Sequence, residues 1–246
     1  MRPVGAALFL DLDGTMYRGD APLRAYAQAM AARAGGRRGE ALAAKAEAFL
    51  RDPRPFMPFR DAWAALSAFG GEAGLDWPTR DDAFVAVRDA IIRGEIPIER
   101  TPGLEEFVLG LDPRVRVAVL TNSEAESAVR LLLYLGLGRL CGHLKGEARK
   151  PSGFAAAVRD HLVGIGPERA VSVGDNLAND VLPARAMGMT TVHVRWPRAE
   201  GGQADLTVAC LEEAFGFLHE RLHAWLSESE RPGTGEAVAE EGGGVP

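Results

Sequence analysis

Short runs rich in apolar and β-branched residues, typical of strands, recur along this chain. They cover residues 6–10, 115–120, 170–173, 190–194 and 206–209. Apolar residues at helical spacing occupy intervals between them, at residues 127–135, 153–163 and 177–187. Strands that alternate with helices predict an α/β fold with a parallel sheet and right-handed crossovers.

The long interval after the first run has only the helical pattern. It is found at residues 25–34, 40–50, 59–69 and 80–92, and glycine pairs or a proline cluster separate these stretches. Thr101 is then an expected N-cap and Pro102 an expected first helical residue, so that a helix leads into the next strand. The sequence therefore predicts an α/β core with an all-helical module inserted directly after the first strand.

Composition narrows the class of protein. With 246 residues and 47% hydrophobic content, the chain can bury a sizeable core. A net charge of −6 argues against a nucleic-acid-binding surface as its main function. Two cysteines, Cys141 and Cys210, are too few for a disulfide framework, and no stretch approaches the roughly 18 apolar residues of a membrane span. We therefore expect a cytoplasmic protein that binds neither nucleic acid nor a membrane.

The C-terminal segment differs from the rest of the chain. Residues 227–246 contain five glutamates and one arginine, and no aromatic residue follows Trp225. Such a segment cannot bury enough apolar surface to offset the entropy lost on ordering. We expect an acidic, disordered tail, with an interaction tail as the alternative.

Two carboxylates follow the first strand directly, in Asp11-Leu12-Asp13-Gly14-Thr15. Strand side chains alternate with period two, so Asp11 and Asp13 fall on the same side of an extended chain. Two like charges that close repel each other unless a cation lies between them or one keeps a proton. The pair is typical of a site for a hard metal such as Mg²⁺, or of a nucleophile beside a general acid. The alternative is a simple Asp-Gly turn.

Polar residues also follow later strands. Thr121-Asn122-Ser123 offers hydroxyl and backbone N–H donors that suit an anionic oxygen. Gly174-Asp175, followed by Asp180, adds two carboxylates at the same edge of the predicted sheet. Lys150 precedes Pro151 at the start of a predicted helix, a position suited to holding a phosphate. Each cluster alone is equally compatible with a cap, a turn or a solvated charge.

The order of these clusters resembles the four motifs of the haloacid dehalogenase-like (HAD) hydrolases. The similar segments are Asp11-Leu12-Asp13-Gly14-Thr15 for the first motif, Thr121-Asn122 for the second, Lys150 for the third and Gly174-Asp175 through Asp180 for the fourth. The resemblance implies a Rossmann-like parallel sheet core of residues 1–16 and 100–226. It also implies that the inserted residues 17–99 are a helical cap, which leaves residues 227–246 as the tail.

The resemblance implies roles for the four aspartates. Asp11 would be the nucleophile that forms an aspartyl-phosphate. Asp13 would protonate the leaving alcohol and later deprotonate the hydrolytic water. Mg²⁺ would be bound by Asp11, the backbone carbonyl of Asp13 and Asp175, with Asp180 as a ligand or as support for the ligands.

The same resemblance implies a phosphate site and a reaction class. Thr121, the Asn122 N–H and Lys150 would hold the phosphoryl oxygens. Because the dehalogenase branch lacks an aspartate at the position of Asp13, the resemblance favours phosphoryl transfer. We expect an Mg²⁺-dependent phosphomonoester hydrolase that acts on a small phosphorylated metabolite. A phosphomutase of the same fold, similar to β-phosphoglucomutase, and a non-catalytic binding protein are the alternatives.

Two further signals are weaker. The segment His219-Glu220-Arg221-Leu222-His223 fits the HExxH pattern of zinc proteases, but no histidine follows it and a catalytic zinc needs a third protein ligand. We expect it to be the exposed face of the last core helix. Arg54 and Arg60 would meet an anionic leaving group or, more simply, be solvated surface charges.

Overall fold

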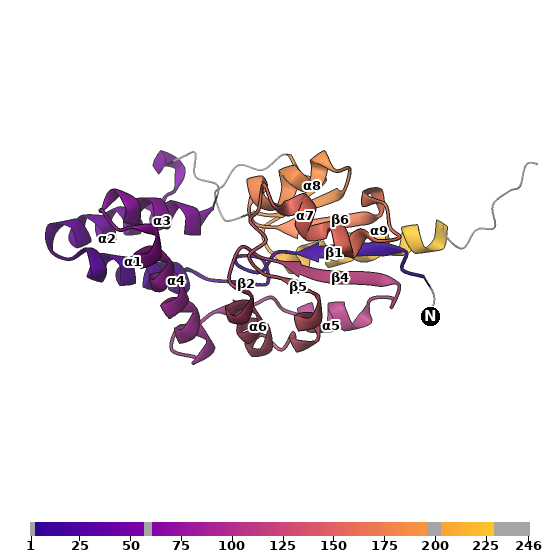
Figure 1. Ribbon diagram of the computed structural model, residues 1–246, viewed down its shortest axis with the longest axis horizontal. Coiled ribbons are helices and arrows are strands. Elements are labelled where there is room, and N and C mark those ends of the chain that lie inside the picture. Colours follow the sequence, from indigo (N-terminus) through magenta and orange to yellow (C-terminus); the bar gives the residue numbers. More distant parts are fainter. Residues whose placement is uncertain (1–2, 57–60, 196–202, 229–246) are drawn as a thin grey trace, which may run out of the picture.

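The computed structural model describes residues 3–56, 61–195 and 203–228. Its central sheet has six parallel strands in the spatial order β5-β4-β1-β6-β7-β8 (Figure 1). The strands are β1 (Ala6–Leu10), β4 (Val115–Leu120), β5 (Leu144–Lys145), β6 (Ala170–Gly174), β7 (Thr190–Val194) and β8 (Leu206–Val208). The α/β fold is confirmed. Of these six strands, only β5 has no counterpart in the sequence pattern, because two residues are too few for a periodic signal.

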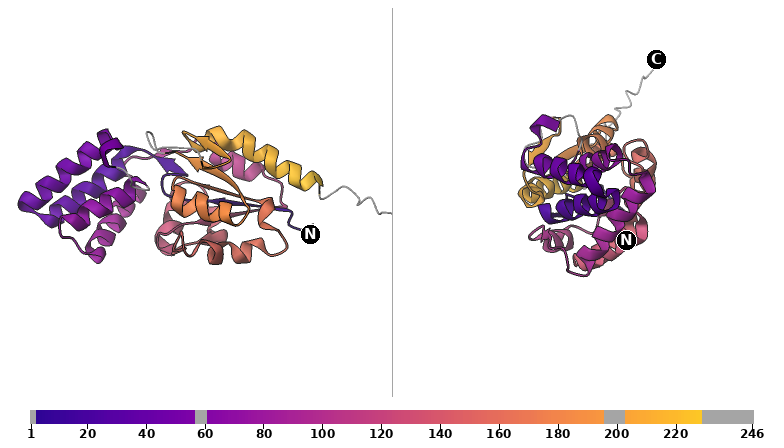
Figure 2. Two further views of the ribbon diagram at one scale, coloured as in Figure 1. Left: turned by 90° about the horizontal axis from the view of Figure 1, so that it is seen from above. Right: turned by 90° about the vertical axis from the view of Figure 1, so that its left-hand side faces the viewer.

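Helices cover both faces of this sheet. The side chains of β1 alternate between two apolar clusters, with Leu8 in one and Phe9 in the other. On the sheet, α5 (Leu104–Gly110), α6 (Ala125–Tyr134) and α9 (Phe215–Glu228) contribute to the first cluster, which also continues into the inserted helices, and α7 (Phe154–Val158) and α8 (Leu182–Ala186) contribute to the second. The left view of Figure 2 shows α9 and α7 on opposite faces. β1 is therefore a fully buried central strand.

A separate helical module lies beyond the carboxyl ends of the strands (Figures 1 and 2). It consists of α1 (Asp20–Ala34), α2 (Gly36–Arg51), α3 (Ala62–Glu72) and α4 (Trp77–Ile92). α3 continues through Gly70, where the sequence suggests a break. A Cβ on Gly70 would lie 2.6 Å from the Met30 sulfur, so this glycine allows close packing of two helices.

Two short strands join the module to the core. β2 (Tyr17–Arg18) and β3 (Glu99–Arg100) pair antiparallel, and neither is apparent from the sequence. The expected N-cap role of Thr101 is wrong, because α5 begins after Gly103. The Thr101 hydroxyl instead donates to the Thr15 carbonyl at 3.3 Å and so ties the returning chain to the segment after β1.

The structure shows where the C-terminal helix and the residues of the weaker sequence signals lie. α9 runs to Glu228, so the first two residues of the expected tail are helical, and residues 229–246 lie outside the described part. His219 and His223 are exposed on α9. Arg54 is exposed and pairs with Asp52 at 2.8 Å, while Arg60 lies outside the described residues. Among the helices that are described, none is long and apolar enough to cross a membrane.

Candidate active site

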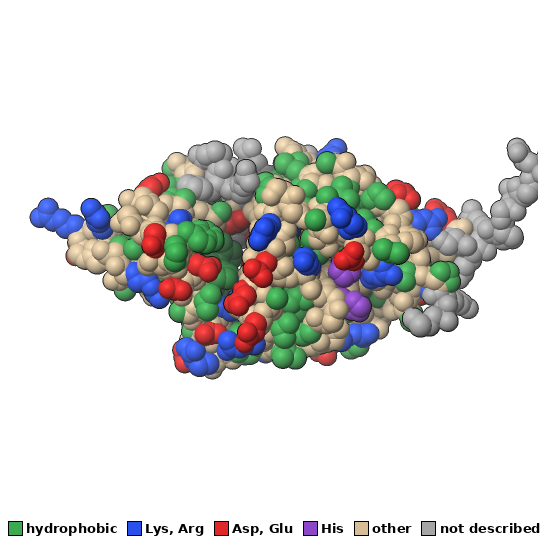
Figure 3. Space-filling view, viewed as in Figure 1, with side chains coloured by type: hydrophobic (Ala, Val, Ile, Leu, Met, Phe, Trp, Pro, Cys, Tyr) green, Lys and Arg blue, Asp and Glu red, His purple; other side chains and the backbone are tan. Residues whose placement is uncertain are grey.

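The carboxyl ends of three neighbouring strands bring the sequence motifs together. β1 lies between β4 and β6, and these strands lead into Asp11, Thr121 and Asp175 respectively. In open α/β sheets ligands bind where the strand order reverses, outside the carboxyl ends of the strands. Here that edge opens into a cavity of about 810 Å³ between sheet and helical module. Figure 3 shows the hollow, with acidic side chains gathered around it.

Three carboxylates converge on the floor of this cavity. Asp11, Asp175 and Asp180 each place one oxygen within 4.8 Å of the others. Two glycines make this approach possible. A Cβ on Gly14, whose φ is +84°, would collide with the carboxylate of Asp175, and a Cβ on Gly174 would collide with that of Asp180. The glycines of the two motifs therefore leave room for the carboxylates.

A widened helical turn brings Asp180 back to the strand end. The helix expected at residues 177–187 starts as a π-helical turn, Leu177–Val181, and becomes α-helical only in α8. The Asn176 side chain caps this turn, and its backbone N–H donates to Asp180 Oδ2 at 3.2 Å. Ser172 donates its hydroxyl to the Asp180 carbonyl at 2.9 Å. Such turns recur at functional sites because they redirect one side chain.

Lys150 is buried among these carboxylates. Its Nζ donates to Asp11 Oδ1 at 2.7 Å, to Asp180 Oδ1 at 2.5 Å and to the Leu120 carbonyl at 2.8 Å, which occupies all three protons. The Asn122 side chain holds the backbone of Lys150 through two hydrogen bonds of 3.0 and 2.7 Å. Sequence reasoning gave Asn122 only a backbone role, because the pairing of residues 28 positions apart has no local signal.

Burial dominates the electrostatics of the carboxylates. It raises the pKa of Asp11 to about 7, with Lys150 opposing the shift, and it raises the pKa of Asp175 and Asp180 in the same direction. Asp11 and Asp180 are buried and Asp175 is half-buried, and among the described residues one ammonium, that of Lys150, lies beside the three carboxylates, so negative charge is in excess. Oxygen ligands and excess negative charge suit a hard divalent cation, which would favour the ionised carboxylates. The residues present therefore fit Mg²⁺.

Asp13 lies apart from that cluster and is held by donors from three segments. Arg88 Nη2 donates to both of its carboxylate oxygens at 2.5 and 2.6 Å, the Tyr17 hydroxyl donates at 2.6 Å, and the Ser123 hydroxyl at 2.9 Å. Sequence reasoning missed Arg88, which belongs to α4 of the helical module. The available signal was an arginine within the apolar stripe that includes Val87 and Ile91.

The segment after β4 presents donors to the cavity. The Thr121 hydroxyl is buried and accepts from the Ser123 N–H at 3.1 Å. Its own proton and the backbone N–H of Asn122 have no acceptor among the described residues. Both groups are therefore available to an anionic oxygen.

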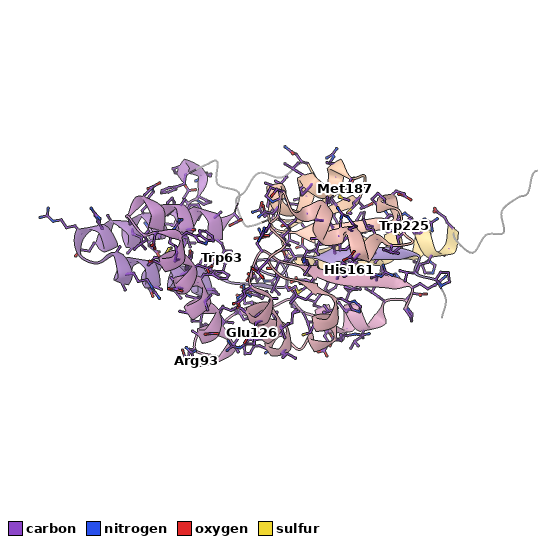
Figure 4. All side chains as sticks on the ribbon, in the orientation of Figure 1. Trp63, Arg93, Glu126, His161, Met187 and Trp225 are labelled. Carbon is purple, nitrogen blue, oxygen red and sulfur yellow. The ribbon has the colours of Figure 1, made fainter. Side chains whose placement is uncertain are left out.

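The helical module provides the opposite wall. Figure 4 shows Trp63 at the end of the module that faces the sheet, and its ring meets that of Phe84 at 5.1 Å. Asp61 caps α3 by accepting from the Ala64 N–H at 2.6 Å, and it also accepts from the Asn176 side chain of the core. The cavity thus has carboxylates and donors on the sheet side, and aromatic rings together with a few polar and charged side chains on the other.

Comparison with known proteins gives a family for this arrangement. The family model described as "Hydrolase: haloacid dehalogenase-like hydrolase" matches residues 6–188. The chain belongs to the haloacid dehalogenase-like hydrolases. A phosphoserine phosphatase of Thermus thermophilus is 30% identical over an alignment 245 residues long, gaps included, that covers 85% of this chain and 97% of the relative. This HAD-like protein is therefore an enzyme, a hydrolase of the phosphatase type.

Solved structures support the fold of this HAD-like hydrolase. CbbY of Rhodobacter sphaeroides, solved with phosphate, has a TM-score of 0.58 at 17% identity and covers 85% of this chain and 96% of its own. The HAD-hydrolase YfnB of Bacillus subtilis, solved with magnesium, has a TM-score of 0.58 at 14% identity. The match covers 87% of this chain and 98% of YfnB. At these identities the likeness concerns the fold alone.

Proposed function

We propose that this enzyme is an Mg²⁺-dependent phosphomonoester hydrolase that acts on a small phosphorylated metabolite through an aspartyl-phosphate on Asp11. The observation that carries the proposal is the position of Asp11 at the centre of the sheet edge, facing the cavity and touching Lys150 at 2.7 Å. A second aspartate, Asp13, follows two residues later and is held separately. In this proposal residues 1–16 and 100–226 are the catalytic core and residues 17–99 are the cap.

The phosphoryl group would bind between the donors after β4 and the carboxylate cluster. The Thr121 hydroxyl and the Asn122 N–H would donate to its oxygens, and Lys150 would offset the charge of Asp11 as the anion approaches. The carboxylates of Asp11, Asp175 and Asp180, with the carbonyl of Asp13, would hold Mg²⁺. The ion, when bound, neutralises the charge that develops on the phosphoryl oxygens.

Two steps would complete the hydrolysis. A carboxylate oxygen of Asp11 attacks phosphorus, the bond from phosphorus to the leaving oxygen breaks, and Asp13 gives that oxygen a proton. Water then attacks the aspartyl-phosphate while Asp13 takes the proton from the water, which releases phosphate and restores Asp11. The burial of Asp11 and the cap above it limit competition by bulk water.

The relative offers a first substrate to test. Because the Thermus relative is a phosphoserine phosphatase, phosphoserine belongs in the first set of compounds, together with sugar phosphates and phosphoglycolate. Among the described residues on the cap side of the cavity, Arg80 carries a guanidinium, and its Nη1 already donates to Ser67 at 2.9 and 3.1 Å.

The test is phosphate release from these compounds with and without Mg²⁺. We expect Asp11→Asn, which keeps the shape of the side chain, to abolish turnover, and Asp82→Asn, at an exposed position of the cap, to leave it unchanged. Equal activity of Asp11→Asn and wild type would contradict the proposal. Isomerisation that depends on a bisphosphate and releases no net phosphate would favour a phosphomutase instead.

A further inference from the structure

Arg88 is a fully buried arginine whose partners lie outside its own module. Its side chain is 1% exposed, yet it belongs to α4 of the cap. Nη2 donates to both oxygens of Asp13 and to the Ser123 hydroxyl at 3.0 Å, and both of these residues belong to the core. From the cap, the ring of Phe84 lies 4.9 Å from the guanidinium carbon, and Nη1 has no hydrogen-bond partner among the described residues.

Stability does not account for such an arginine. A buried ion pair roughly breaks even against apolar side chains of the same volume, because both charges lose their hydration. The unpartnered Nη1 of Arg88 adds a cost, since a buried donor without an acceptor keeps its full desolvation penalty. An arginine retained in this place is better explained by what it does to Asp13.

Asp13 takes its position from three donors that are distant in sequence. Tyr17 donates from β2, Ser123 from the segment after β4, and Arg88 from the last helix of the cap. Of these donors, Arg88 alone is charged and alone belongs to the helices of the cap. The position of the Asp13 carboxylate therefore depends on how α4 docks on the core, where α4 packs against α6.

We propose that Arg88 is a positioning residue for Asp13, on the basis of the hydrolase function proposed above. When the bond from phosphorus to the leaving oxygen breaks, its electron pair stays on that oxygen and the proton of Asp13 moves there. Asp13 is left as a carboxylate, and Arg88 donates to it together with Tyr17 and Ser123. Arg88 thereby stabilises the product of the proton transfer and makes the acid available only when the cap is docked.

Leaving-group dependence distinguishes this role from a structural one. An alkyl phosphate needs a proton on its leaving oxygen, whereas p-nitrophenyl phosphate leaves as a stable anion. General acid catalysis contributes roughly 100- to 10,000-fold to such steps, and we expect Arg88→Gln to forfeit part of it, about 10- to 100-fold in kcat/KM for an alkyl phosphate. For p-nitrophenyl phosphate we expect Arg88→Gln to lower kcat/KM less than about threefold. The reason is that kcat/KM reports only the steps up to departure of the leaving group, and this leaving group needs no proton.

Two more variants complete the experiment. Arg93→Gln is the matched control, because Arg93 lies at the end of the same helix, is exposed and pairs with Glu95 (Figure 4); we expect wild-type values for both substrates. Arg88→Lys keeps the charge but not the two-oxygen contact, so we expect a smaller loss with the same preference for p-nitrophenyl phosphate. If Arg88→Gln does not fold, Arg88→Lys still tests the proposal.

Three outcomes separate the two proposals. If the wild type releases phosphate and the Arg88 variants lose activity on the alkyl ester selectively, Arg88 acts through Asp13, and the double variant with Asp13→Asn should lose little more than Asp13→Asn alone. An equal loss on both substrates would overturn the positioning role and leave the hydrolase function intact. Absence of wild-type phosphate release from every ester would overturn the hydrolase function itself.

Discussion

Lys150→Met removes the one ammonium that lies among the buried carboxylates. Methionine keeps the length and the apolar stem of the side chain but none of its three donors. Asp11 and Asp180 would each lose a charged hydrogen bond, of 2.7 and 2.5 Å, and the Leu120 carbonyl would lose its donor. The two carboxylates and Asp175 would then repel one another within 4.8 Å without a counter-charge.

The expected loss of folding stability follows from the burial of the ion pairs that Lys150 makes with Asp11 and Asp180. Removal of one partner from a buried ion pair costs about 3–5 kcal/mol, because the other charge is left without compensation. Partial protonation softens the loss, since the pKa of Asp11 is already raised to about 7. We therefore expect the lower end, about 3 kcal/mol. For a chain of this size each kcal/mol corresponds to roughly 2–4 °C in Tm, so the expected loss is about 6–12 °C.

Thermal denaturation in a chelating buffer measures this effect. Lys45→Met is the matched control, because Lys45 packs over Phe69 and pairs with Glu72 at the surface, where an ion pair contributes less than about 1 kcal/mol. We expect saturating Mg²⁺ to raise the Tm of Lys150→Met more than that of the wild type, because the cation replaces the missing charge. A Tm of Lys150→Met within about 2 °C of wild type would refute the reasoning.

Three further predictions concern the same edge of the sheet. Because burial raises the pKa of Asp11 from 3.8 to about 7, the folded protein binds more protons than the unfolded chain between these values. The Tm in chelator should therefore fall between pH 5 and pH 8, and less so for Asp11→Asn; a rise would contradict this sign. Gly174→Ala should cost about 1–3 kcal/mol in thermal denaturation, because its Cβ would collide with a carboxylate, whereas Gly142→Ala has open space. Thr121→Val should raise the KM roughly 10- to 100-fold in phosphate-release assays, while Thr207→Val, at an exposed position, serves as the control.

The local pattern of the chain was sufficient for five of the six strands of the central sheet and for the positions of the motif residues. The five predicted strands lie within one residue of the observed bounds. The signal is clearest for β1, because its burial along the whole length produces a continuous apolar run. The expected edge placed Asp11, Thr121 and Asp175 together, since parallel strands end on one side. These inferences use only periodicity and chain direction.

Contacts between distant segments could not be inferred in the same way. Arg88 meets Asp13 across 75 positions, and the Asn122 side chain holds Lys150 across 28. Thr101 bonds to Thr15 rather than capping α5, although its local sequence is that of a cap. Thr101 thus had a good local alternative, and tertiary packing selected the distant partner.

The sequence by itself thus determined which candidate residues follow the strands and on which edge of the sheet they lie, because strand periodicity and motif order are local properties. Only the tertiary structure decided how these residues are divided. It places Asp11, Asp175 and Asp180 around Lys150 and turns Asp13 toward Arg88 of the helical module. That division depends on the docking of α4 against the core, and the free energy of docking is a sum over packed surfaces that no local pattern records.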